Sequence, residues 1–156
     1  MVRSYARRRS DACPWDTKQP ETYRYGFGVF AFDVRKAKEL ICASPREIRM
    51  VDTSRERVER LIGRPPEPDS FDIGTVYVDW EKAKTADIST PLIVAMARVD
   101  PESQKRSPVV IDGHHRLARA WLDKIPELPY VLLTDEESDE VMTETIRLPR
   151  RKQRSR

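Results

Sequence analysis

The two histidines of the chain stand together in a short run of residues that can carry chemistry. Residues 112–116 read Asp-Gly-His-His-Arg, and they follow an apolar stretch at 109–111 and precede a helical pattern. We therefore expect a turn between a strand and a helix. The first amides of a helix have no intrahelical partners and carry partial positive charge, which favours a bound anion. The turn is a predicted phosphate site, built from Gly113, His114, His115 and Arg116.

Each residue of this turn has its own part in the prediction. Gly113 lets the backbone turn and approach a ligand closely, and the side chains of the three residues that follow surround the same point. Asp112 has three roles open to it: it can help to hold a divalent cation, orient a histidine, or only cap the helix. Arg116 in the first turn opposes the helix dipole, which indicates that an anion or a carboxylate lies close to it.

The run Asp-Gly-His-His-Arg-Leu-Ala-Arg-Ala that begins at Asp112 resembles the phosphate-binding motif of the ParB/sulfiredoxin superfamily. It is most similar to the form found in the free serine kinases of this fold, and the resemblance covers roughly residues 73–138. It implies that Gly113, His114, His115 and Arg116 bind nucleotide phosphate. It also implies a catalytic or metal-binding acid at Asp112, with His114 and His115 as further candidate catalytic residues.

The sequence departs from the family's pattern in three places. His114 stands where sulfiredoxins have a cysteine, which excludes reduction of a sulfinic acid through a thiol at that position. About 18 residues follow Ser138, so the further domains of a partition protein are not expected. No upstream glutamate aligns with the base of the kinases, for which Asp79 and Glu81 are the nearest acids. Serine phosphorylation is therefore left open.

These observations lead to functions of different classes. The first is a stand-alone ParB/sulfiredoxin-like domain that binds a nucleoside triphosphate, ATP or CTP, with a divalent metal such as Mg²⁺. Whether it also hydrolyses the nucleotide or transfers its phosphate is left open. The alternative is a nucleic-acid-binding accessory protein or a metal-dependent nuclease that uses basic ends. A third is a scaffold that binds a protein through N-terminal helices. The sequence does not indicate the base, the phosphoryl acceptor or the oligomeric state.

The net charge of +3 hides an uneven distribution along the chain. Residues 1–10 and 147–156 hold ten basic side chains and no acid, which leaves 19 basic against 26 acidic side chains, or −7, for residues 11–146. Basic ends can bind DNA or RNA by releasing counterions from its phosphates, whereas the middle of the chain would be repelled. The same ends can equally be solvated and disordered without a partner.

Hydrophobic periodicity and turn residues divide the chain into five parts. We expect a basic disordered tail at 1–20, an N-terminal helical extension at 21–63, a proline-rich connector at 64–72, a ParB/sulfiredoxin-like domain at 73–146 and a basic tail at 147–156. Strands are predicted at 23–31, 75–78, 92–95, 109–111 and 130–133. Helices are predicted after Asp33, after a Thr53/Glu56 capping box, after the histidines, and after a Thr134/Glu137 capping box as far as Ile146. The pattern predicts an α+β fold, a small mixed sheet with packed helices.

Length and composition narrow the class of protein. A chain of 156 residues with 38% hydrophobic residues suits one compact domain. No apolar run approaches the roughly 20 residues that cross a bilayer, and no signal-peptide pattern follows Met1. We therefore expect a soluble cytoplasmic protein with no membrane partner. Cys13 and Cys42 have neither metal-ligand nor disulfide-framework spacing and are predicted to be reduced thiols.

Overall fold

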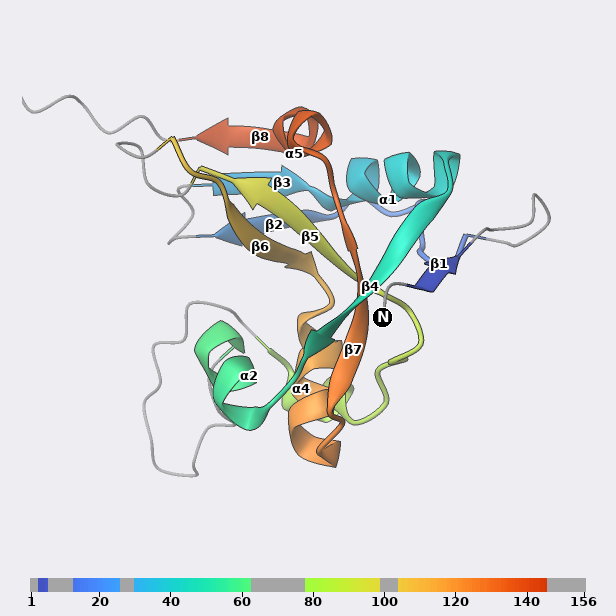
Figure 1. The fold of residues 1–156 in the computed structure, drawn as a ribbon, viewed down its shortest axis with the longest axis vertical. Helices are drawn as coiled ribbons and strands as arrows, with labels where there is room; N and C mark the ends of the chain where they lie inside the picture. Colours follow the sequence, from blue (N-terminus) through green and yellow to red (C-terminus); the bar gives the residue numbers. More distant parts are fainter. Residues whose placement is uncertain (1–2, 6–12, 26–29, 63–77, 99–103, 146–156) are drawn as a thin grey trace, which may run out of the picture.

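The computed structural model describes residues 3–5, 13–25, 30–62, 78–98 and 104–145 (Figure 1). Within them the helices are α1 (Val34–Ala43), α2 (Arg55–Ile62), α3 (Trp80–Ala83), α4 (His114–Asp123) and α5 (Asp135–Val141). The strands are β1 (Arg3–Tyr5), β2 (Thr22–Tyr25), β3 (Phe30–Asp33), β4 (Arg46–Asp52), β5 (Leu92–Ala97), β6 (Ser107–Asp112), β7 (Glu127–Leu132) and β8 (Met142–Thr145). The predicted α+β class is confirmed.

The strands form two sheets. The larger has the order β1-β4-β7-β5-β6, in which β5 and β7 run parallel and the other neighbours antiparallel. The smaller has the order β2-β3-β8 and is antiparallel. Strands β4 and β7 run between the part of the molecule that holds the small sheet and the part that holds α2 and α4 (Figure 1). The large sheet is therefore mixed, as the sequence predicts.

Both faces of the large sheet are buried. On one face, Ile93, Ala95 and Ala97 of β5 join a core cluster that includes side chains of β3, α1 and α5. On the other face, Leu92 joins a second cluster with side chains of α2, α3 and α4. Alternate residues of a strand point to opposite faces, so the uninterrupted apolar sequence of β5 serves both clusters. The described residues thus form three layers. The large sheet lies in the middle, with the small sheet, α1 and α5 on one face and α2, α3 and α4 on the other.

Two predicted helix caps are confirmed. The Asp33 carboxylate accepts a hydrogen bond from the Lys36 backbone N–H (3.0 Å) at the start of α1. Thr134 and Glu137 form the reciprocal capping box of α5, with each side chain bonded to the other residue's backbone N–H. Each cap satisfies amides that have no partner inside the helix.

The predicted cap at Thr53 was wrong. Helix α2 begins at Arg55, and its first backbone bond runs from the Val58 N–H to the Ser54 carbonyl (3.0 Å). The buried Thr53 hydroxyl donates instead to the Ile125 carbonyl, beyond the end of α4. A buried hydroxyl needs a hydrogen-bond partner, and the Ile125 carbonyl supplies it here.

Among the described residues before position 63, strands β1 and β4 add to the elements that the sequence predicts. Strand β1 pairs with β4, and β4 lies between β1 and β7 in the large sheet. Trp15 is buried in the same cluster as Phe32 and Ile41. Strand β4 was missed because charged residues such as Glu47 and Arg49 occupy its exposed positions and dilute the apolar alternation. The N-terminal part therefore completes the sheet.

The C-terminal half follows the predictions except at its end. The strands expected at 92–95, 109–111 and 130–133 are β5, β6 and β7. The helix expected as far as Ile146 ends at Val141, and Met142–Thr145 form β8 against β3. The β-branched Thr143 and Thr145 favour a strand there. The expected strand 75–78, except for Val78, the connector 64–72 and the tail 147–156 lie outside the described residues.

Cys13 and Cys42 form a disulfide, with their Cα atoms 5.6 Å apart, so the prediction of reduced thiols was wrong. The two residues are 29 positions apart, and their spacing is not one that predicts a disulfide. Trp15 packs into the core near the end of α1, and this brings Cys13 to Cys42. In the described part of the chain, no helix is long and apolar enough to cross a membrane.

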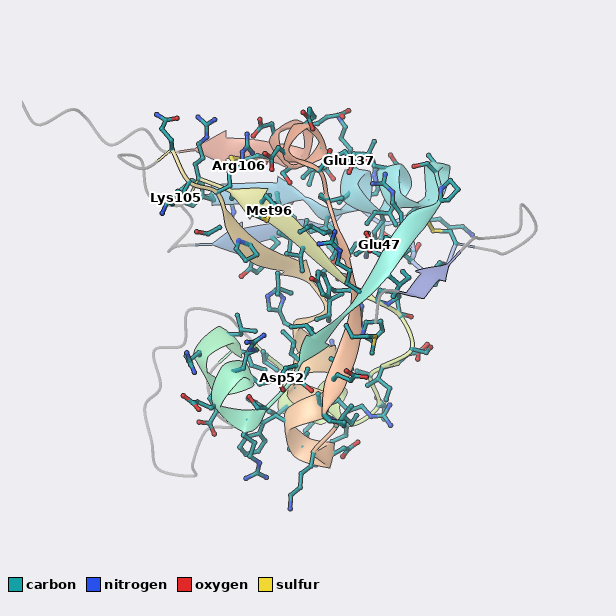
Figure 2. The ribbon with its side chains drawn as sticks, in the orientation of Figure 1. Glu47, Asp52, Met96, Lys105, Arg106 and Glu137 are labelled. Atoms are coloured by element: carbon teal, nitrogen blue, oxygen red, sulfur yellow. A yellow bond between two sulfur atoms is a disulfide. The ribbon has the colours of Figure 1, made fainter. Side chains whose placement is uncertain are left out.

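Ion pairs fasten α5 to the large sheet, where Figure 2 shows Met96, Arg106 and Glu137. Arg46 of β4 donates two hydrogen bonds to the Glu137 carboxylate (2.8 and 2.6 Å), and this lowers the pKa of Glu137. Arg106 binds Asp139 in the same two-pronged way (2.9 and 2.8 Å). The Met96 N–H donates to the buried Ser138 hydroxyl (2.9 Å). A side chain of α5 is thereby hydrogen-bonded directly to the backbone of β5.

Candidate functional site

Strand β6 passes into α4 through Gly113, as the sequence predicts. Gly113 has φ 105°, in the left-handed region, and a Cβ there would collide with Leu92 and come within 3.2 Å of the Arg116 Nη1 atom. Only glycine fits this position. Among the described residues no side chain caps the start of α4. The first amides of the helix are therefore not satisfied by a side chain, as an anion site requires.

Arg116 folds back over this turn. One nitrogen, Nη1, donates to the carbonyls of Thr90 (2.9 Å) and Pro91, and Nη2 donates to the Asp112 carboxylate (2.8 Å). The side chains of Arg116 and Asp112 are only 14% and 11% exposed. The carboxylate expected near Arg116 is thus Asp112, and the guanidinium joins the segment before β5 to the turn.

Asp112 does not cap α4, and its bond to Arg116 is the role that the structure gives it. A resident magnesium ion would need several oxygen ligands in a nearly octahedral set. Among the described residues, no group of three or more histidine, cysteine or acidic side chains is placed to hold a metal. The donor set at Asp112 therefore does not fit a metal held by the protein alone.

The ring of His115 is held by a hydrogen bond from the backbone of Asp79. Its Nε2 atom accepts a hydrogen bond from the Asp79 N–H (3.2 Å), so a neutral ring carries its hydrogen on Nδ1. The Asp79 carboxylate caps α3 through the Glu81 and Lys82 amides (3.1 and 3.2 Å). Glu81 itself pairs with Lys84 (2.9 Å). Both acids considered as a catalytic base are therefore engaged in other bonds.

His114 is held as a neutral ring. Burial lowers its pKa to about 4, and the charges of His115 and Arg116 act in the same direction, against the opposing charge of Asp112. The ring stacks on Tyr23 of β2, with centroids 4.7 Å apart and planes 25° apart. At neutral pH His114 therefore has no positive charge to offer a phosphate.

Trp121 joins the three helices on the far face of the large sheet. Its Nε1–H donates to Glu59 of α2 (3.1 Å), and the Arg55 guanidinium lies 4.4 Å above its ring. Trp80 of α3 meets it edge-on, with centroids 5.8 Å apart. Leu117 and Ala120 are buried in the core, whereas Trp121 is only partly buried.

The turn thus gathers all five predicted site residues, together with partners that sequence reasoning missed. Those partners are the Tyr23 ring, the Asp79 amide and the Thr90 and Pro91 carbonyls. Hydrogen bonds to backbone groups cannot be read from residue types. The only sequence signal at Tyr23 is the alternation that predicts a strand. Comparison of the chain with protein-family models, with curated proteins and with solved structures gives no match.

Proposed function

We propose that this protein is a nucleotide-binding domain that holds the phosphates of a nucleoside triphosphate, ATP or CTP, at the start of α4. The observation that carries the proposal is a glycine turn with no side-chain cap, flanked by both histidines of the chain. Backbone amides and the helix dipole attract a phosphate there. The sequence resemblance to ParB/sulfiredoxin domains supports the same function, and membership of that superfamily is part of the proposal.

The charges around the turn refine how such a ligand binds. Arg116 is neutralised by Asp112, and His114 is neutral, so the amides of α4 supply most of the attraction, with the half-buried His115 beside them. Magnesium would enter only as the counter-ion of the nucleotide phosphates, because Asp112 is already paired with Arg116. Hydrolysis or phosphoryl transfer would need a base, and Asp79 and Glu81 are both bonded elsewhere. Binding is therefore favoured over catalysis.

A matched pair of variants tests this site. His115→Glu places a negative charge beside the first amides of α4, which favours the helix and repels a phosphate. His115→Gln keeps a neutral acceptor for the Asp79 N–H. We expect ATP or CTP with Mg²⁺ to raise the melting temperature of the wild type and of His115→Gln, and not of His115→Glu. The proposal fails if no nucleotide stabilises the wild type, or if folded His115→Glu binds as the wild type does.

The uneven charge of the chain favours a second candidate function. Ten basic side chains at the two ends flank a middle that carries −7, so the ends can bind DNA or RNA, as an accessory protein or a nuclease would. The residues beyond β8 that hold most of this charge lie outside the described part of the chain. The sequence predicts a cytoplasmic location, whereas the Cys13–Cys42 disulfide favours an oxidising compartment, because disulfides are rare in a reducing cytosol.

A further inference from the structure

The ring of Tyr23 reaches the first residue of α4 from the other end of the chain. Tyr23 lies in β2, opposite Phe32 of β3, and packs against the core cluster between the two sheets. Its stacking on His114 is nearly parallel, with 4.7 Å between centroids. A stacked pair of this kind restrains both rings and excludes water from the faces in contact.

The side chain of His114 is partly buried beside this contact, and the Tyr23 ring covers one of its faces. The ring therefore links the small sheet to the turn that carries the proposed phosphate site.

We infer that Tyr23 is a positioning residue that holds His114, so that strand β2 forms part of the nucleotide site. This inference rests on the proposed function. Removing the Tyr23 ring would open one face of His114 to water and free its side chain to turn. The first turn of α4, which begins at His114, would then lose its contact with the small sheet, and the amides that bind phosphate would be less well ordered.

The test compares two substitutions at Tyr23 with one at its neighbour. Tyr23→Phe keeps the stacked ring, Tyr23→Leu removes it, and Thr22→Ala changes an exposed residue on the opposite face of the same strand. We follow the His114 ring by NMR as the pH is changed and measure Mg-ATP and Mg-CTP affinity by calorimetry. The groups whose charges also act on His114 are Asp112, His115 and Arg116, and none of the variants alters them.

In Tyr23→Leu the pKa of His114 should rise by at least one unit, and nucleotide affinity should fall at least tenfold. Tyr23→Phe, which keeps the stacked ring, and Thr22→Ala should match the wild type. An unchanged pKa of His114 in folded Tyr23→Leu overturns the inference. If Tyr23→Leu does not fold, NMR contacts between the two rings in the wild type decide instead, and their absence overturns it. A wild type that binds no nucleotide refutes the proposed function, while the pKa comparison still judges the stacking.

Discussion

Reducing the Cys13–Cys42 disulfide should destabilise the protein strongly. The bond closes a loop between residues 29 positions apart. The entropy that such a closure removes from the unfolded chain corresponds to about 3.6 kcal/mol at 25 °C. For a domain of this size, that free energy lowers the melting temperature by about 10 °C. Reduction leaves every side chain in place, so the loss measures the bond itself.

The assay is thermal unfolding with and without a phosphine reductant, followed by circular dichroism. The double variant Cys13→Ser, Cys42→Ser is the control, because it should melt near the reduced wild type and ignore the reductant. Thiol titration of the folded protein should find no free thiol before reduction and two afterwards. Equal melting temperatures for the oxidised and reduced wild type, or two titratable thiols in unreduced folded protein, would refute the pairing.

Three further predictions concern the turn and the ends of the chain. Because burial lowers the pKa of His114 to about 4 from about 6.5 in the unfolded chain, the unfolded state binds more protons between these values. Stability should therefore fall by up to about 3 kcal/mol as the pH drops from 6.5 to 4, and His114→Gln should flatten the urea-derived profile. Arg116→Ala leaves the Asp112 carboxylate unpaired and should cost about 3 kcal/mol in urea unfolding. Unchanged stability with lost nucleotide affinity would instead make Arg116 a phosphate ligand. Deleting residues 147–156, with six basic side chains and no acid, should weaken DNA binding in anisotropy titrations at two salt concentrations and leave the melting temperature unchanged. Equal binding by the truncated chain would place the nucleic-acid site elsewhere.

The local geometry of the turn could be predicted because its signals are local. An apolar run, a glycine that no other residue can replace and a helical pattern follow one another within residues 109–124, and the structure has β6, Gly113 and α4 there. The same holds for the caps at Asp33 and Thr134, whose partners lie within three residues.

The contacts that hold the turn could not be predicted, because their partners are distant in sequence. The residues around Arg116 do not predict its hydrogen bond to the Thr90 carbonyl. Those around His114 do not predict its stacking on the Tyr23 ring. Strand β4 was not predicted for another reason: its exposed charged residues resemble those of a loop. At Met142 the helical spacing of apolar residues continues, but pairing with β3 outweighs it.

The position of β4 has a consequence for any attempt to divide the chain. A cut within residues 63–77 would give one fragment with β1 to β4 and another with β5 to β8. Each fragment would hold strands of both sheets, since β8 belongs with β2 and β3, and β4 belongs beside β7. Neither could bury its apolar faces alone. The two fragments are therefore suited to complementation, in which mixing them restores the fold. Folding of one fragment would then report that the other is present.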